Sequence, residues 1–216
     1  YYKILVPEKN SKGKGFRKGY LWVVVGINTR MIYLLYDDGS RSEKVILNEL
    51  GGCKGIIQSD GYSPYRKLES DAYPHITRIP CLQHIKRKFI DCGEDEPDAK
   101  RIVELINTLY QNEHKHKIGV DGWTVEQNLV HRKKYAPDIL GEIKDVLDDI
   151  EERGDLLPKS ELKEAVTYLR NEWNAVVDIF NYGDTYLDNN IVERMNRYIS
   201  LSRKNSLFFG SHKGAE

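Results

Sequence analysis

The chain has 216 residues, of which 40% are hydrophobic and 31% charged, and 33 basic residues balance 33 acidic ones. This composition is typical of a soluble globular protein, and no apolar run approaches the roughly 20 residues of a membrane helix. Because the net charge is zero, only local basic clusters could support nucleic-acid binding. Three cysteines without disulfide spacing favour reduced thiols and a cytoplasmic location.

The first part of the chain predicts three strands followed by alternating helices and strands. Runs rich in β-branched and aromatic residues indicate the strands, and a Gly-rich basic connection at residues 8–18 separates the first two. The predicted strands cover residues 3–6, 20–25, 31–36, 54–59 and 76–81, and the predicted helices cover residues 42–50, 63–69 and 84–89. This order predicts an α/β fold with a mixed sheet flanked by helices.

From residue 94 to about residue 180 the chain predicts almost only helix. Apolar residues recur at helical spacing along three segments, and Pro158 is expected to begin the third helix. We therefore expect an all-helical insertion within the α/β core. The predicted division is a first part of the core at residues 1–93, a helical insertion at 94–182, and a last helix with a basic tail at 183–216.

Two acidic residues are candidates for chemistry. Asp60 ends a predicted buried strand, where α/β sheets often place functional side chains, but an Asp-Gly pair is also a common turn. Glu193 lies in the first turn of a predicted helix beside Arg194 and Arg197. Its spacing from Asn190 equally fits a capping box, in which Glu193 would only stabilise the helix start.

Basic and metal-binding residue types form further clusters. Cys81 and His84 follow the strand at 76–81, but a zinc site needs four ligands, and no suitable second pair follows; His114 and His116 lie in a polar segment predicted as helical. Lys86, Arg87 and Lys88 could contact a phosphate backbone or form a solvated helix face. Arg203 and Lys204 precede aromatic and small residues, a composition that suits contacts to nucleic acid.

Taken together, several stretches resemble the bacterial DDE transposases of the insertion sequence 66 (IS66) type. The matching stretches are residues 18–23, 41–42, 57–62 with Tyr65, 81–89, 188–190 with Glu193 and Arg194, and 202–208 with 210–211 and 214–215. The resemblance implies a fold similar to ribonuclease H, with the helical insertion before the last catalytic residue. It also implies that Asp60 is the second catalytic carboxylate, that Glu193 is the third, and that His84 lies beside the catalytic centre.

The same resemblance implies a mechanism. Three carboxylates would hold two Mg²⁺ or Mn²⁺ ions that promote cleavage at transposon ends and strand transfer into target DNA. The family's first carboxylate is expected just before Tyr1, so this fragment is expected to be inactive alone. Arg194 and Arg197 would neutralise phosphate, and Lys86, Arg87, Lys88, Arg203 and Lys204 would position DNA.

The expected partner is double-stranded DNA, both transposon ends and target, with a homo-oligomer in the active complex and no membrane. Two alternatives remain open at this point. One is a non-catalytic DNA-binding module derived from a transposase. The other is a ribonuclease H-like nuclease that acts on branched or hybrid nucleic acid.

Overall fold

The computed structural model describes residues 2–5 and 16–205, and it describes only the backbone of residues 2–5, 16, 17, 199, 200 and 202–205. Contacts divide the chain into two compact units. The first unit comprises residues 1–53 and 189–216, and the second comprises residues 54–188. The predicted domain boundaries at residues 93 and 182 remain a prediction.

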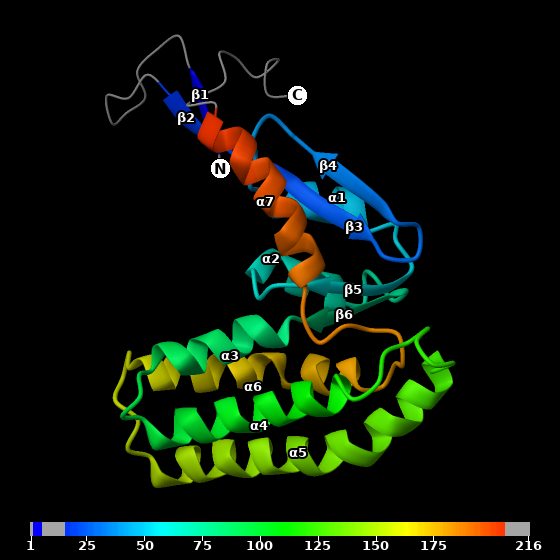
Figure 1. The fold of residues 1–216 in the computed structure, drawn as a ribbon. Coiled ribbons are helices and arrows are strands. Elements are labelled where there is room, and N and C mark those ends of the chain that lie inside the picture. The colour runs from blue at the N-terminus through cyan, green and yellow to red at the C-terminus, as the bar shows by residue number, and fades with distance from the viewer. Residues whose placement is uncertain (1, 6–15, 206–216) are drawn as a thin grey trace. The chain divides into compact units, whose positions relative to one another are not determined.

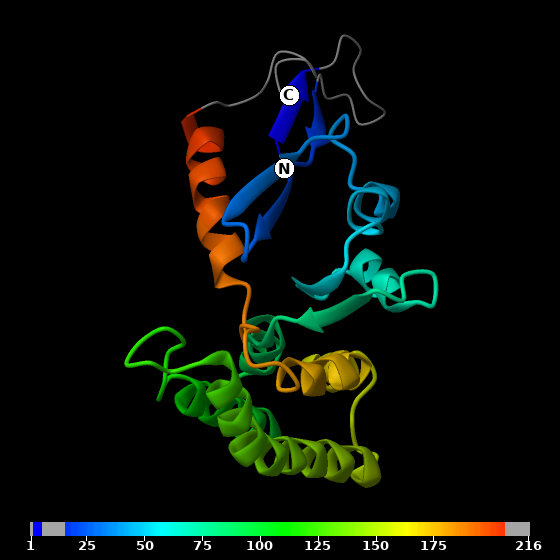
Figure 2. The same cartoon turned by 90° about the vertical axis from the view of Figure 1, so that its right-hand side faces the viewer.

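The first unit combines two antiparallel strand pairs with two helices. Its elements are β1 (Tyr2–Leu5), β2 (Phe16–Gly19), β3 (Trp22–Gly26), β4 (Met31–Leu35), α1 (Glu43–Leu50) and α7 (Asn190–Asn205). Strand β1 pairs with β2, and β3 pairs with β4. Helix α7 packs against β3 and runs beside the β3–β4 hairpin in Figure 2.

Local chemistry explains the elements of the first unit. The Trp22 indole N–H donates to the Ser40 carbonyl oxygen over 3.0 Å, which ties the start of β3 to the segment after β4. The Ser42 hydroxyl caps α1 by accepting from the Lys44 backbone N–H. The buried face of α1 includes Val45 and Ile46.

The second unit places a parallel strand pair beside a group of long helices. Its elements are β5 (Gly55–Ser59), α2 (Ser63–Arg66), the 3-10 helix η1 (Lys67–Glu69), β6 (Ile76–Pro80), α3 (Leu82–Asp91), α4 (Pro97–Glu113), α5 (Val125–Arg153) and α6 (Glu161–Ile179). Helix α3 contacts α4 and α6, α4 contacts α5, and α6 contacts β6 (Figure 1). The helices therefore support the strand pair through α6.

Apolar residues at helical spacing build the core of the second unit. Helix α4 contributes Ile102, Leu105, Ile106 and Leu109, and α5 contributes Ile139, Ile143, Leu147 and Ile150. A capping box at Thr124 and Gln127 begins α5, and Gly154, with φ 64°, ends it. None of the described helices is both long and apolar enough to cross a membrane.

The structure confirms a mixed α/β protein with a helical middle and corrects several details. Within the described residues the strands form three separate pairs instead of the single mixed sheet that we predicted. Strand β2 occupies residues 16–19, most of which we assigned to a connection. The third long helix begins at Glu161 and not at Pro158, because the Ser160 hydroxyl caps it by accepting from the Lys163 N–H over 3.2 Å.

Candidate active site

Asp60 directly follows the last residue of β5 and is half-buried. Its Oδ1 accepts a hydrogen bond from the Tyr62 backbone N–H over 3.1 Å, and its backbone carbonyl accepts one from the Ser59 hydroxyl over 3.0 Å. The first bond is the turn interaction expected of an Asp-Gly pair. A carboxylate offers about four acceptor positions, so the turn leaves capacity for a cation.

Helix α6 brings Tyr168 against the turn that holds Asp60. A Cβ atom added at Gly61 would lie 1.7 Å from the Tyr168 hydroxyl oxygen, so only glycine allows this close approach. Burial, followed by the negative charges of Glu172 and Asp60, raises the pKa of Tyr168 to about 12. The phenol therefore stays neutral and can donate a hydrogen bond at physiological pH.

A buried ion-pair network supports this strand end. The Glu172 side chain is fully buried and accepts from Arg66 Nε over 2.8 Å and from the buried guanidinium of Arg78. Arg78 also contacts Glu69. Burial alone would lower the pKa of Arg78, but its hydrogen bonds and ion pairs with Glu172 and Glu69 outweigh burial and raise it. The network fastens α6 to β6 and α2 next to Asp60.

Glu172 is absent from the predicted site residues, although its position on the apolar face of α6 marks it as inward-facing. Glu172 lies three residues after Leu169 and four before Val176, and both of these are buried in the core. A carboxylate on the apolar face of a helix must find a cationic partner, because an unpaired buried charge is very unfavourable. The spacing therefore marks Glu172 as a buried member of an ion pair. Only the fold shows that its partners are Arg66 and Arg78.

The predicted basic residues of α3 are only partly solvated. Lys86 is half-buried, whereas Arg87 and Lys88 are exposed. The Lys88 ammonium lies 5.3 Å from the centroid of the Tyr168 ring, and the guanidinium carbon of Arg66 lies 6.0 Å from the same centroid. The structure thus gathers two cations and a phenol around the turn of Asp60.

His84 lies in the first turn of α3 and is half-buried. Its backbone N–H donates to the Cys81 carbonyl oxygen over 3.1 Å. The Leu82 N–H donates over 2.9 Å to the carbonyl oxygen of Leu187, a residue from the far end of the second unit. The start of α3 therefore holds both the predicted Cys81–His84 pair and the segment that precedes Asp188.

Side chains of the second unit hold that segment at two further points. The Gln58 side-chain amide donates to the Tyr186 carbonyl oxygen over 2.7 Å and to the Pro80 carbonyl oxygen over 3.2 Å. Burial, followed by the nearby charge of Asp188, raises the pKa of the Tyr110 phenol on α4. The segment from Tyr186 to Asp188 is thus attached to β5 through Gln58, to α3 through Leu82 and to α4 through Tyr110.

Glu193 lies in the first turn of α7 in the first unit and is half-buried. Helix α7 begins at Asn190, and the Glu193 N–H donates to the Asn189 carbonyl oxygen over 3.2 Å. Glu193 is therefore the fourth helical residue, whereas a capping box uses the third. The spacing between Asn190 and Glu193 that suggested a capping box does not match the observed helix start.

The remaining predicted DNA-binding residues, Arg194, Arg197, Arg203 and Lys204, lie on α7. Arg194 and Arg197 are exposed. The side chains of Arg203 and Lys204 and the whole tail at residues 206–216 lie outside the described residues. Their predicted roles in positioning DNA remain predictions.

The donor chemistry of the candidate residues suits a hard divalent cation. Asp60, in the second unit, and Glu193, in the first, both offer carboxylate oxygens, the ligands that Mg²⁺ and Mn²⁺ prefer. In the described parts of the chain no three His, Cys, Asp or Glu side chains are placed to hold a metal ion together. Each candidate is thus positioned by its own unit.

A model of a known protein family matches the part of the chain that holds these residues. The model of the family described as "Transposase IS66 family" matches residues 3–216, which is nearly the whole chain and includes Asp60, His84 and Glu193. No solved structure matches the chain.

Curated relatives come from Sinorhizobium fredii (strain NBRC 101917 / NGR234). The uncharacterized protein y4jD is 30% identical over 184 residues, which cover 82% of this chain and 35% of that protein. The uncharacterized protein y4qI is 28% identical over 212 residues, which cover 91% of this chain and 38% of that protein. The chain therefore spans little more than a third of the length of these relatives.

Proposed function

The chain belongs to the IS66 family of transposases, and we propose that it forms the catalytic part of a DDE-type transposase. The proposed reaction is cleavage of DNA at transposon ends, followed by transfer of the freed strand to target DNA. The observation that carries this proposal is the family match over residues 3–216. Its local support is the half-buried carboxylate of Asp60 at the end of a parallel strand.

The fold that we propose is ribonuclease H-like with a helical insertion. Its support is the order of elements, in which the antiparallel β3–β4 hairpin precedes the parallel β5–β6 pair and three long helices precede α7. In this assignment α4, α5 and α6 form the insertion. Asp60, directly after β5, and Glu193, on α7, are then the second and third catalytic carboxylates.

Asp60 and Glu193 are the residues that we propose as ligands of Mg²⁺ or Mn²⁺, with two ions in the complete site. Bound metal ions would stabilise the charge that develops on the attacking and leaving oxygens of the phosphodiester. The backbone N–H of Tyr62 orients the Asp60 carboxylate, and Gly61 lets Tyr168 cover the turn. Arg66 is paired with Glu172, so the exposed Lys88 beside the Tyr168 ring is the cation that would favour the approach of a phosphate.

In the proposed cleavage step water adds to phosphorus and the bond to one ester oxygen breaks, which frees a 3′-hydroxyl. In the transfer step this hydroxyl attacks a phosphodiester of the target, and the attacked strand supplies the leaving oxygen. Both steps are in-line displacements at phosphorus, so one set of ligands can serve both. We expect the active complex to be a homo-oligomer bound to double-stranded DNA.

The test is a cleavage and strand-transfer assay of the full-length protein on its transposon ends with Mg²⁺. Replacing a ligand carboxylate removes several kcal/mol of charge stabilisation, so Asp60→Asn and Glu193→Gln should each lower the rate by about a thousandfold or more. Asp71→Asn, at an exposed aspartate, is the matched control and should retain full activity.

Product analysis separates the proposal from its alternatives. Joined donor and target strands identify a transposase, whereas cleavage without joining would identify a ribonuclease H-like nuclease. DNA binding without either product would identify a non-catalytic module. Wild-type activity in the Asp60→Asn and Glu193→Gln variants would refute the assignment of the two carboxylates.

A further inference from the structure

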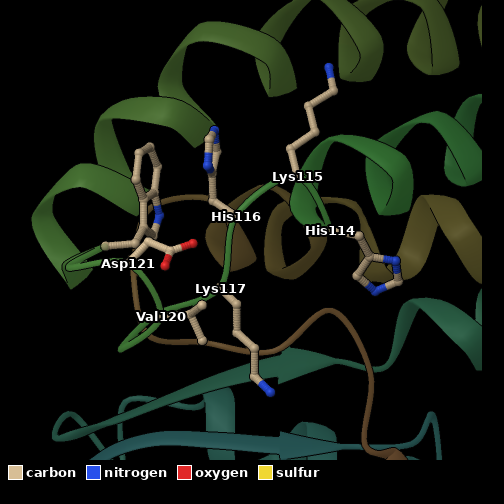
Figure 3. Close-up of a pocket in the computed structure, with 7 residues that line it drawn as sticks. His114, Lys115, His116, Lys117, Val120 and Asp121 are labelled. Carbon is tan, nitrogen blue, oxygen red and sulfur yellow. The ribbon is translucent and has the colours of Figure 1, made fainter.

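The loop between α4 and α5, residues 114–123, contains a cluster of basic and aromatic side chains that the proposed catalytic chemistry does not use. We call it the α4–α5 loop. Residues 114–117, with Val120, Asp121 and Trp123, line a pocket of about 190 Å³ (Figure 3). Residues 114–117 read His-Lys-His-Lys and are all exposed.

Backbone hydrogen bonds fix the shape of the α4–α5 loop. The Gly119 N–H donates to the Trp123 carbonyl oxygen, and the Trp123 N–H donates to the Val120 carbonyl oxygen, both over 2.9 Å. Gly119 and Gly122 have φ angles of 82° and 75°, which glycine adopts without strain. The loop is therefore formed before any ligand binds, which lowers the entropy lost on binding.

Aromatic contacts attach the loop to α5. The His116 ring stacks on Trp123 with centroids 3.8 Å apart and an angle of 13° between the planes. The His131 ring of α5 lies edge-on to His116 with centroids 5.1 Å apart, and its Nε2 lies 3.1 Å from the Asn112 carbonyl oxygen of α4. The basic segment is thus supported by both neighbouring helices.

Lys115 and Lys117 form no ion pair with a carboxylate of the described residues. Lys115 donates to the neutral amide oxygen of Asn112 over 2.7 Å. By contrast, four arginines of α4, α5 and α6 each pair with a carboxylate; they are Arg101, Arg132, Arg153 and Arg170.

The arrangement of the pocket favours anions over metal ions. The described residues contain no group of three His, Cys, Asp or Glu side chains that could hold a metal ion, so His114 and His116 form no zinc site with them. The pocket lining contains one carboxylate, that of Asp121, but two lysines and two histidines, so basic side chains outnumber acidic ones. In Figure 3 the side chains of Lys115 and Lys117 point to opposite sides of the segment, so they would meet different anionic groups.

We propose that the α4–α5 loop is a DNA-binding site in which Lys115 and Lys117 contact separate phosphates of the duplex backbone. DNA presents phosphates at regular spacing, which suits two diverging ammonium groups better than one free phosphate does. The choice of DNA rests on the proposed function. The contact positions the substrate and carries no sequence information of its own, because it involves the backbone alone.

The test measures the affinity of the full-length protein for duplex DNA by fluorescence anisotropy over a series of salt concentrations. Each phosphate contact contributes about 0.9 to the slope of log K against log salt, so Lys115→Ala/Lys117→Ala should reduce the slope by about 1.8 if both contacts exist. The same relation predicts roughly 60-fold weaker binding at about 0.1 M salt, or roughly 8-fold if only one lysine contacts DNA.

Two controls isolate the effect of charge at this site. Lys144→Ala/Lys163→Ala removes two exposed lysines from α5 and α6 and should leave the slope unchanged. Lys115→Arg/Lys117→Arg keeps the charges and should retain the wild-type slope. The proposal would be overturned if Lys115→Ala/Lys117→Ala kept the wild-type slope of log K against log salt. It would also be overturned if this variant lost no more slope than Lys144→Ala/Lys163→Ala.

Competition with inorganic phosphate distinguishes DNA from a free anion. Saturable binding of millimolar phosphate that is lost in the alanine double variant, with the salt dependence of DNA binding unchanged in that variant, would identify a free-phosphate pocket and overturn the proposal. The outcome is separable from the proposed function. Normal cleavage with an unchanged slope refutes only the loop assignment, whereas a reduced slope without any cleavage refutes only the catalytic one.

Discussion

At the scale of single residues, Glu172 is the side chain on which the surroundings of Asp60 most depend. Two arginines, from α2 and from β6, meet on its carboxylate inside the protein. A buried charge is tolerated only with such partners, and removal of one partner leaves the others uncompensated. The network therefore makes the position of Asp60 depend on α6, an element far from it in sequence.

We predict that Glu172→Gln lowers the free energy of unfolding by about 3–5 kcal/mol, because it leaves the buried Arg78 without its main counter-charge. Urea denaturation followed by circular dichroism measures the change. Glu164→Gln, at an exposed position of the same helix, is the control and should change stability by less than about 0.5 kcal/mol. Equal stability of the two variants would show that the network does not stabilise the fold.

At the scale of elements, Arg132 joins three parts of the helical middle. Its fully buried guanidinium contacts Glu113 of α4, the Ile179 carbonyl oxygen at the end of α6 and the Thr185 hydroxyl. The Tyr135 hydroxyl also donates to Glu113, over 2.8 Å. The ends of α4 and α6 are thus fixed to α5 by a single charged cluster.

This cluster predicts a loss of stability in acid. Burial alone would raise the pKa of Glu113, but hydrogen bonds and charge from Arg132, with hydrogen bonds from Tyr135 and Asn128, outweigh it and lower the pKa below 4.5. Because the folded state has the lower pKa, the carboxylate contributes stability above pH 4.5, and the contribution disappears as the pH falls through the folded value.

Unfolding measured by urea at several pH values checks this prediction. Glu113→Gln should be less stable than the wild type at pH 7, and the difference should shrink on acidification below pH 4.5. Glu152→Gln, at an exposed position of α5, should show no such convergence. A Glu113→Gln variant whose stability runs parallel to the wild type across the acid range would contradict the lowered pKa.

Local patterns in the sequence predicted most elements, because their signals are short-range. The apolar faces of α4 and α5 and the helix predicted at 42–50, observed as α1, follow from residues close to each other in sequence. Buried charges were missed because a Glu or Arg is expected at the surface. Arg132 lies four residues from the buried Asn128 and Ala136, so helical spacing alone marks it as inward-facing.

Long-range features could not be predicted from spacing. The attachment of Tyr186 to Gln58 joins residues 128 positions apart, and no local rule indicates such a pair. The same holds for the strands, whose pairing in three separate pairs depends on tertiary packing rather than on β-propensity. Local patterns singled out Asp60, His84 and Glu193, but the family resemblance supplied the shared catalytic role that we propose for them.

At the scale of the whole molecule, the compact second unit, residues 54–188, includes more than the predicted insertion at 94–182. Its core combines Leu82, Ile85 and Phe89 of α3 with the apolar faces of α4, α5 and α6. A core shared in this way cannot form without α3. The helical middle and the β5–β6 pair are therefore expected to fold together.

We predict that a fragment of residues 54–188 folds on its own and unfolds cooperatively in urea, with a slope of about 1–3 kcal/mol per M. A fragment of residues 94–182 lacks α3 and Leu187, both of which contribute to the core, and should not show a cooperative transition. Circular dichroism in the near and far ultraviolet follows both. Cooperative unfolding of the 94–182 fragment, or its absence in the 54–188 fragment, would contradict the assignment of residues 54–188 as one folding unit.

The hydrogen bonds from Gln58 and Leu82 to the carbonyl oxygens of Tyr186 and Leu187 have an evolutionary consequence. They fix the position of the segment that follows α6, whatever the length of the helices before it. Helices between these anchor points can be lengthened, shortened or exchanged while that segment stays where it is. Related chains can thus vary this region as a module, provided that the two backbone attachments and the contacts of Glu172 and Tyr168 of α6 around Asp60 persist.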